Sequence, residues 1–219
     1  MRQDRRGTVQ AAAEGERRKT ILRAAISVFA EKGYHGCRIS DVAREAKVAY
    51  GLVYHYFQDK QALLQSVFEV GWGGFVTRVR EAAEGSGTIQ EKVERILTVA
   101  FDAYRVDPQA VKVILLEIAR NPTVGRVNRR SQFRDVIEIG GRMFAEAQQK
   151  GELKSGADPM LYGAFLFGAI ELGLTAFVLG LVEGDSEEAL AHAKRQLADS
   201  FLEGVSAPRQ AGLVLTSSG

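Results

Sequence analysis

The chain has 219 residues, of which 46% are hydrophobic and 26% charged, with four prolines and a single cysteine. This composition is that of a globular protein of one large domain or two smaller ones, and it excludes an intrinsically disordered chain. The lone Cys37 excludes an internal disulfide and a cysteine-based metal cluster.

Charge is distributed unevenly along the chain. Residues 1–60 contain 12 Lys and Arg against 7 Asp and Glu, a net charge of +5, whereas the remaining 159 residues carry −3. The formal net charge of +2 therefore hides a basic N-terminal part. A basic segment of this kind favours a polyanion partner such as DNA.

An apolar segment over residues 161–182 has Glu171 as its only charged residue, and its length is that of a membrane span. Its glycines and alanines, its central carboxylate and the acidic loop after it favour a helix buried at a protein interface instead. The N-terminal residues lack the apolar core of a secretory signal, so we expect no membrane partner and a cytoplasmic location.

Helical periodicity runs along nearly the whole chain without strand-like alternation, which predicts an all-α fold of about nine helices. The first helix is expected over about 14–32 and ends at Gly33, and two short helices follow. A fourth begins after Asp59 and ends before Gly85. Capping side chains mark the later boundaries, which are Thr88 with Glu91, Asp107-Pro108, Asn121-Pro122, Lys150-Gly151, Asp158-Pro159 and Asp185 with Glu188.

The three helices before Asp59 form a helix-turn-helix arrangement, in which the second helix of the closely joined pair enters the major groove of DNA. This recognition helix is expected from about Ala49 to Phe57. Tyr54 and His55 can donate to phosphate oxygens, Gly51 permits close approach of the backbone, and Tyr50 offers an apolar face to thymine. Solvated surface is the alternative for Tyr54 and His55. Lys60, in the first turn of the next helix, can bind phosphate.

The stretch Arg17–Leu64 carries a combination of motifs. They are Ile21-Leu-x-Ala24-Ala25, Phe29-Ala-Glu-x-Gly33-Tyr34, Ser40-Asp-Val-Ala43, Ala46-x-Val48 and Gly51-Leu-Val-Tyr54-His-Tyr-Phe57-x-x-Lys60-x-x-Leu63. Together they closely resemble the tetracycline-repressor-like (TetR) family of bacterial transcription regulators. The resemblance implies a DNA-binding N-terminal domain, a C-terminal helical domain that binds a small-molecule inducer, and a homodimer built on the last two helices.

With this resemblance, the expected organisation is a disordered basic arm over 1–13, a helix-turn-helix DNA-binding domain over 14–60, a ligand-binding and dimerisation domain over 61–206, and a flexible tail over 207–219. Contact of the arm with the minor groove or the DNA backbone is the alternative to disorder.

Three positions depart from the family pattern. Arg38 stands where Thr or Ser usually begins the second helix, Lys47 where the turn usually has Gly, and Ala49 where Ser usually caps the recognition helix. The last two changes each cost about 1 kcal/mol. Arg38 and Lys47 are expected to make charged phosphate contacts instead. The expected DNA-contacting residues are Arg38, Ser40, Lys47, Ala49, Tyr50, Gly51, Tyr54, His55 and Lys60.

Aromatic residues are frequent after residue 61, and by default they form a hydrophobic core. The resemblance implies that some of them line a ligand cavity between helices. The expected ligand-binding residues are Trp72, Phe101, Tyr104, Arg120, Arg130, Phe133, Arg134, Phe144 and Glu171, with the arginines receiving a phosphorylated group at the cavity mouth. For Glu171, a hydrogen bond across a dimer axis is the alternative.

The segments Lys150–Lys154 and Phe167–Glu171 are similar to the TetR-type fatty-acid degradation repressors that respond to long-chain acyl-CoA. The inducer is therefore expected to be an acyl-CoA or another apolar ligand. Small residues between 163 and 176 permit close approach of helices from two chains. The expected dimer-interface residues are Gly163, Phe167, Gly168, Thr175 and Leu179.

The sequence contains no nucleophile elbow and no phosphate-binding loop, and its three histidines lack metal spacing. We therefore expect no enzyme activity, no catalytic residue, no cofactor and no metal site. The prediction is a one-component DNA-binding transcriptional regulator, a repressor released from a palindromic operator by a small apolar ligand. A ligand-independent architectural DNA-binding protein and a small all-α enzyme are the alternatives.

Overall fold

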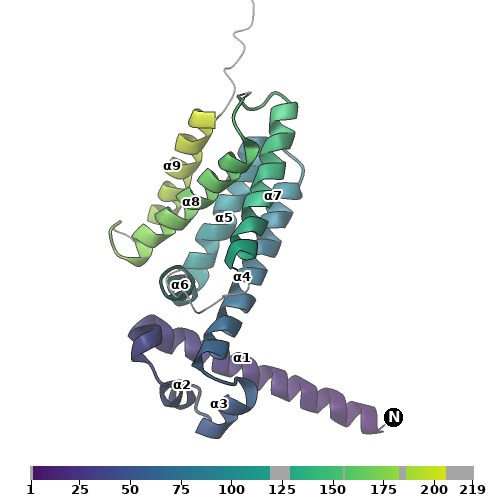
Figure 1. Cartoon of the computed structure of the whole chain (residues 1–219), viewed down its shortest axis with the longest axis vertical. Coiled ribbons are helices and arrows are strands. Elements are labelled where there is room, and N and C mark those ends of the chain that lie inside the picture. The colour runs from purple at the N-terminus through teal and green to yellow at the C-terminus, as the bar shows by residue number, and fades with distance from the viewer. Residues whose placement is uncertain (1, 119–128, 155, 183–185, 206–219) are drawn as a thin grey trace, which may run out of the picture.

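A computed structural model describes residues 2–118, 129–154, 156–182 and 186–205. Within these residues there are nine α-helices, one π-helical segment and no strand, which confirms the predicted all-α fold. The helices are α1 (Arg2–Gly36), α2 (Ile39–Glu45), α3 (Tyr50–Tyr56), α4 (Lys60–Glu84), α5 (Ile89–Val106), α6 (Pro108–Lys112), η1 (Val113–Ile118, the π-helix), α7 (Arg129–Gln149), α8 (Pro159–Val178) and α9 (Glu187–Val205). Figure 1 shows α2 and α3 at one end of the molecule and the bundle of α5, α7, α8 and α9 at the other.

The long helix α4 joins two hydrophobic cores (Figure 1). Its first turns, with Leu63, Leu64 and Val67, are buried among the side chains of α1, α2 and α3. Its last turns, with Val79 and Ala83, belong to the larger core of the bundle. The two cores are therefore mechanically connected by one continuous helix, and the boundary expected at 60/61 coincides with the start of that helix rather than with the end of the first core.

Side-chain caps explain where the middle helices begin. Asp59 accepts a hydrogen bond from the backbone nitrogen of Ala62 at 2.7 Å, and Asp107 accepts one from Ala110 at 2.9 Å. Thr88 forms the expected capping box with Glu91 before α5, and Asp158 caps α8. These caps satisfy backbone N–H groups that a helix leaves free at its N-terminus, so the predicted starts of α4, α5, α6 and α8 are confirmed.

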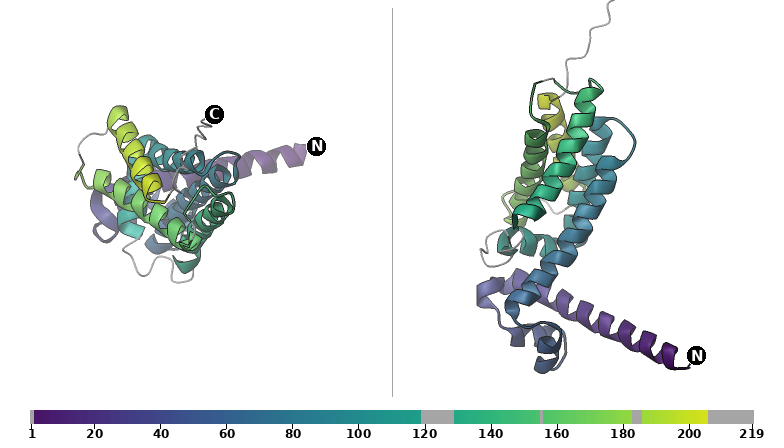
Figure 2. Two further views of the ribbon diagram at one scale, coloured as in Figure 1. Left: turned by 90° about the horizontal axis from the view of Figure 1, so that it is seen from above. Right: turned by 45° about the vertical axis from the view of Figure 1, so that its right-hand side comes forward.

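The helix α1 begins earlier than expected. The sequence predicts a disordered arm over 1–13, whereas the backbone is helical from Arg2 onward and projects away from the rest of the molecule (Figures 1 and 2). Residues 10–16 are exposed and rich in Ala and Glu. Both residue types have a high intrinsic helix propensity, which favours a helix here even where the chain makes no tertiary contacts. Gly33 interrupts the helix with φ of 68°, so the predicted end at this glycine is confirmed, and one further turn follows.

Some predicted boundaries fall outside the described residues. The start of the seventh helix at Asn121-Pro122 lies in 119–128, the cap at Asp185 lies in 183–185, and the tail expected over 207–219 lies beyond 205. At the start of α9, the hydroxyl oxygen of Ser186 accepts a hydrogen bond from the backbone nitrogen of Ala189 at 3.1 Å. Gly151 ends α7 with a φ of 75°, as expected.

Helices α7 and α8 approach each other closely because both carry glycine at the contact. A Cβ atom added to Gly163 would lie 2.7 Å from the carbonyl oxygen of Ile137, and one added to Gly140 would lie 2.9 Å from the Cα of Gly163. In the described part of the chain, α8 alone is long and apolar enough to cross a membrane by length and composition. Its packing against α7 is that of a helix in a protein bundle.

Candidate functional site

The turn between α2 and α3 is built around a left-handed residue. Lys47 has a φ of 55°, and hydrogen bonds run from its backbone nitrogen to the carbonyl of Arg44 and from Val48 to the carbonyl of Ala43. This pattern closes the end of α2 as a glycine would normally do. The lysine therefore occupies the strained position that the sequence predicts, and its side chain is exposed.

Helix α3 presents its expected outer face to solvent. Tyr50 is 53% exposed and Tyr54 is 44% exposed, and their hydroxyl groups are hydrogen-bonded at 3.2 Å. That hydrogen bond is the main reason why the pKa of Tyr54 lies above its usual value. Gly51 and His55 are also exposed, whereas Val53 is fully buried. The helix thus has one face packed into the core and one face that exposes polar side chains to solvent.

The N-terminal end of α2 is organised by Asp41. Its carboxylate accepts hydrogen bonds from the backbone nitrogen of Arg38 at 2.9 Å, from Lys32 at 3.0 Å and from Arg44 at 2.8 Å. These contacts, the backbone bond first, lower the pKa of Asp41 to about 2. The side chains of Arg38 and Ser40 are exposed beside it, so a basic rim adjoins the outer face of α3. Ala49 is exposed and caps α3 without a side-chain hydrogen bond.

Lys60 does not point to open solvent as a phosphate contact would. Its ammonium group donates to the carbonyl oxygens of Tyr34 at 2.6 Å and Cys37 at 3.0 Å, and it lies 4.5 Å from the centre of the Tyr34 ring. Similarly, the guanidinium group of Arg18 lies 5.2 Å from the centre of the Phe57 ring. The sequence could not indicate these contacts because the carbonyl groups come from a distant helix end.

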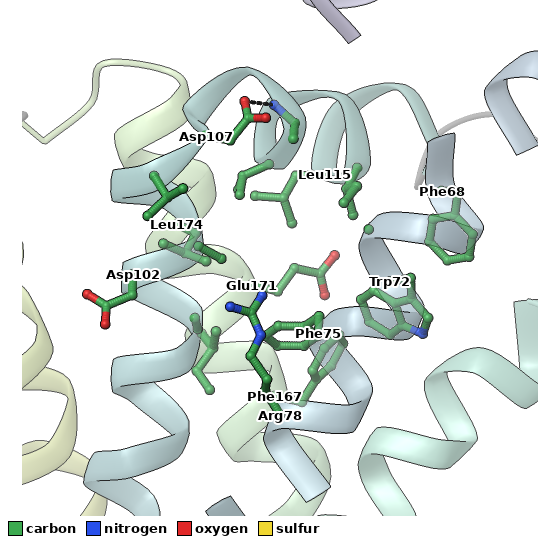
Figure 3. A pocket seen from close by; sticks show the side chains of 18 of the residues that line it. Phe68, Trp72, Phe75, Arg78, Asp102, Asp107, Leu115, Phe167, Glu171 and Leu174 are labelled. Carbon is green, nitrogen blue, oxygen red and sulfur yellow. Dashed lines mark hydrogen bonds between the residues drawn. The ribbon is translucent and has the colours of Figure 1, made fainter. Parts of the chain in front are cut away.

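A cavity of about 260 Å³ lies in the bundle between α4, α5, α6, η1, α7 and α8 (Figure 3). Its walls are mostly apolar, and the sequence-predicted residues Trp72, Phe133 and Glu171 line it. Further lining residues, missed by the sequence reasoning, include Phe68, Gly71, Phe75, Arg78, Ile114, Leu115, Phe167, Ile170 and Leu174. Helical spacing from Trp72 on α4 and from Glu171 on α8 could have found several of them.

The other predicted ligand-binding aromatics form the core instead. Phe101 and Tyr104 pack against Phe177, and Phe144 is fully buried against Tyr162. None of these three predicted residues lines the 260 Å³ cavity, which corrects that part of the expectation. Their ring contacts are with residues of α8 and α9. Tyr104 borders a second, shallower hollow near the end of α1.

The predicted arginine cluster is described only in part. Arg120 and the side chain of Arg130 lie outside the described residues. Arg134 is exposed on α7, with its Nε 3.6 Å from the carboxylate of Glu138, and it does not line the cavity. Arg78, on α4, supplies a guanidinium group at the cavity.

Helix α8 divides its residues between the cavity and the outer surface. Phe167 packs edge-on against Trp72 and Phe133, and Gly163 is buried against α7, so these two residues are occupied within the chain. This placement corrects their assignment to a dimer interface. Gly168 and Leu179 are exposed, and Thr175 is half-buried. Sequence periodicity could not separate these faces because the helix is apolar nearly all round.

The comparisons with known proteins match the chain in two parts, with the boundary in the first half of α4. Residues 21–67 match the family described as bacterial regulatory proteins, tetR family, and residues 68–192 match YsiA-like protein, C-terminal region. The chain is 31% identical over 159 residues to the fatty acid metabolism regulator protein of Bacillus subtilis, covering 73% of this chain and 82% of that protein. It is 29% identical over 168 residues to the HTH-type transcriptional regulator UidR of Escherichia coli, covering 77% of this chain and 82% of that protein.

Solved structures give the same assignment. The fatty acid degradation regulator FadR from Bacillus halodurans aligns with a TM-score of 0.76 and 26% identity, covering 86% of this chain and 95% of that one. FadR from Bacillus subtilis, solved in complex with stearoyl-CoA, aligns with a TM-score of 0.75 and 28% identity, covering 85% of this chain and 98% of that one. The predicted resemblance is confirmed, and the chain belongs to the TetR family of DNA-binding transcriptional regulators, which are not enzymes.

Proposed function

We propose that the protein is a repressor that leaves its operator when an amphipathic acyl ligand of the long-chain acyl-CoA class enters the cavity of the bundle. The apolar walls suit an acyl chain, and the exposed Arg78 at the cavity offers a cation to an anionic head group. The similarity to a regulator solved with stearoyl-CoA supports the same ligand class.

The single observation that carries the proposal is that the cavity shares its walls with the DNA-binding core. In the π-helix η1, Val113 is fully buried in the N-terminal core, whereas the next residues, Ile114 and Leu115, line the cavity. Gly71 on α4 faces this segment, because a Cβ atom at that position would lie 2.9 Å from Cδ1 of Ile114. A ligand that separates α4 from η1 would therefore also move the parts of α4 and η1 against which α1–α3 pack.

The DNA side of the proposal requires two copies of the chain. In a dimer, two recognition helices about 34–36 Å apart would enter successive major grooves of a palindromic operator. The outer face of α8 supports such a dimer, because large apolar side chains are exposed on this helix and at the residue that ends it, namely Met160, Leu161, Phe165, Leu172 and Leu179. An apolar face of this kind favours burial against a second copy. The proposed regulator acts in the cytoplasm, together with its operator DNA.

The proposal is tested with an operator selected by the full chain from random double-stranded DNA. Binding of the labelled operator is followed by fluorescence anisotropy while octanoyl-, palmitoyl- or stearoyl-CoA is added, with free CoA as the control. Release by the long-chain thioesters and not by free CoA is expected. Operator affinity that stays constant with every thioester would overturn the acyl-ligand proposal and favour an architectural DNA-binding protein.

A further inference from the structure

Glu171 is a carboxylate in an otherwise apolar part of the cavity wall. It lies on α8 between the lining residues Phe167, Ile170 and Leu174. Figure 3 shows its carboxylate pointing across the cavity toward Trp72 on α4. The side chain is half-buried, and among the described residues it makes no hydrogen bond or ion pair. Its backbone carbonyl accepts a hydrogen bond from the hydroxyl of Thr175 at 2.7 Å.

The other charged residues of the cavity have contacts of their own. Asp107 caps α6 through the backbone nitrogen of Ala110, and Asp102 lies 3.4 Å from Nε of Arg105. Arg78 donates from its Nε to the backbone carbonyl of Gly74, one turn earlier on the same helix, and no hydrogen bond or ion pair joins its guanidinium group to Glu171. Glu171 thus remains as the acceptor that the described protein groups leave to a ligand.

A ligand that covers Glu171 removes water from its carboxylate. This desolvation is costly unless the ligand returns a hydrogen bond to the same oxygens. A plain alkyl chain provides no donor, whereas a hydroxyl group or an amide N–H does. From this geometry we infer that Glu171 is a specificity-determining residue, which accepts a hydrogen bond from a donor group attached to the apolar chain of the inducer.

The inference rests on the proposed function only in taking this cavity as the inducer site. An acyl-CoA meets the requirement through the amide N–H groups of its pantetheine arm or through a hydroxyl group on the acyl chain. Both sources have the same chemistry at Glu171, namely a neutral donor next to an apolar segment. An unsubstituted hydrocarbon of the same length leaves the carboxylate unsatisfied and is disfavoured.

The test uses pairs of ligands that differ only in a blocked donor. N-decylacetamide is compared with N-decyl-N-methylacetamide, and decanol with decyl methyl ether, so that the amide and hydroxyl sources are separated. Trp72 is the only tryptophan of the chain and lines the cavity, so its fluorescence reports binding to the full-length protein directly. The wild type is expected to bind the donor member of at least one pair about tenfold more tightly.

Two variants complete the test. Glu171→Leu should abolish the preference and should bind the blocked ligands more tightly than the wild type does. Glu171→Gln retains an acceptor oxygen and should keep part of the preference. If the leucine variant folds poorly, the glutamine variant still tests the inference. Glu84→Leu, which removes an exposed carboxylate at the end of α4, is the matched control and should bind as the wild type does.

Equal affinities within both ligand pairs in the wild type would overturn the inference, as would a preference that survives in Glu171→Leu. Failure of the proposed function is recognised separately. In that case long-chain thioesters would leave the protein on its operator, whatever the ratio of affinities within the ligand pairs.

Discussion

The ammonium group of Lys60 lies 2.6 Å from the carbonyl oxygen of Tyr34, so the first residue of α4 closes the C-terminal end of α1. A second carbonyl, that of Cys37, lies at 3.0 Å. The lysine therefore fixes the direction in which α4 leaves the DNA-binding core. Its charge is used inside the domain, whereas the exposed Lys47 is free to approach phosphate.

We expect Lys60→Met to weaken operator binding without changing the dependence of that binding on salt concentration. The variant loses charge-assisted hydrogen bonds that are worth about 1.5–3 kcal/mol of folding stability. Lys47→Met should instead lower the slope of log affinity against log salt by about one. Anisotropy titrations at several salt concentrations, with urea unfolding alongside, measure both effects. A reduced slope in Lys60→Met would show that Lys60 contacts phosphate and would contradict its role in closing the end of α1.

Tyr54→Phe should weaken operator binding about tenfold while leaving the fold intact. The variant keeps the ring but loses a hydroxyl group on the exposed face of α3, which we expect to donate to a phosphate. Tyr56→Phe, on the half-buried side of the same helix, is the matched control. Operator affinity measured by anisotropy should separate the two variants, and equal affinities would remove Tyr54 from the DNA-contacting face.

Asp41 should make the stability of the DNA-binding domain depend on pH in acid. Its folded pKa of about 2 is lower than the unfolded value of about 3.9, so the ionised carboxylate stabilises the folded state above the unfolded pKa. That stabilisation is lost as the pH falls through about 2. The difference in unfolding free energy between the wild type and Asp41→Asn should therefore shrink from pH 5 to pH 2. A constant difference in urea unfolding over this range would contradict the assignment.

Gly163→Ala should destabilise the protein by about 1–3 kcal/mol, because the added methyl group meets the backbone of α7 at 2.7 Å. Gly73→Ala, at an exposed position of α4 outside the proposed dimer interface, is the matched control. No heavy atom lies within 4 Å of its added Cβ, so improved helix propensity is the main effect. Thermal and urea unfolding should rank the two variants in this order, and equal stabilities would contradict the close contact of α7 with α8.

Gly168→Trp should yield a monomer or an aggregate, because Gly168 lies on the exposed side of α8 proposed as the dimer interface. Space around this position is open within one chain, so the tryptophan does not disturb the fold of the protomer. Light scattering measures the mass of the particle in solution. A dimer mass that is unchanged from the wild type would move the interface to another surface.

Local signals in the sequence were sufficient for most helix starts. Asp59, Thr88, Asp107 and Asp158 cap helices through contacts within three residues, and such contacts are visible in the sequence itself. The left-handed turn at Lys47 was likewise predictable, since its position follows from the helix-turn-helix motif. Positions of the outward residues on α3 follow from helical spacing alone.

Tertiary contacts were not predictable in the same way. The carbonyl groups that bind Lys60 belong to a helix end more than 20 residues earlier in the chain. Phe101 and Phe144 have the same residue type as the cavity aromatics, and only the rotation of their helices turns them into the core. For the apolar helix α8, no periodic pattern distinguishes Phe167, which faces the cavity, from the exposed Leu172.

Val113 and the first turns of α4 are buried in the N-terminal core. Their burial limits where a DNA-binding domain can be joined to the ligand-binding domain of a related protein. A DNA-reading unit cut at residue 60 would lose Leu63, Leu64 and Phe68 along with Val113, and would expose the apolar faces that they cover. A chimaera with a new inducer specificity must therefore keep the sequence through Phe68 and a matching side chain at 113. Recombination within the family is constrained at these two places, which lie 45 residues apart in the chain.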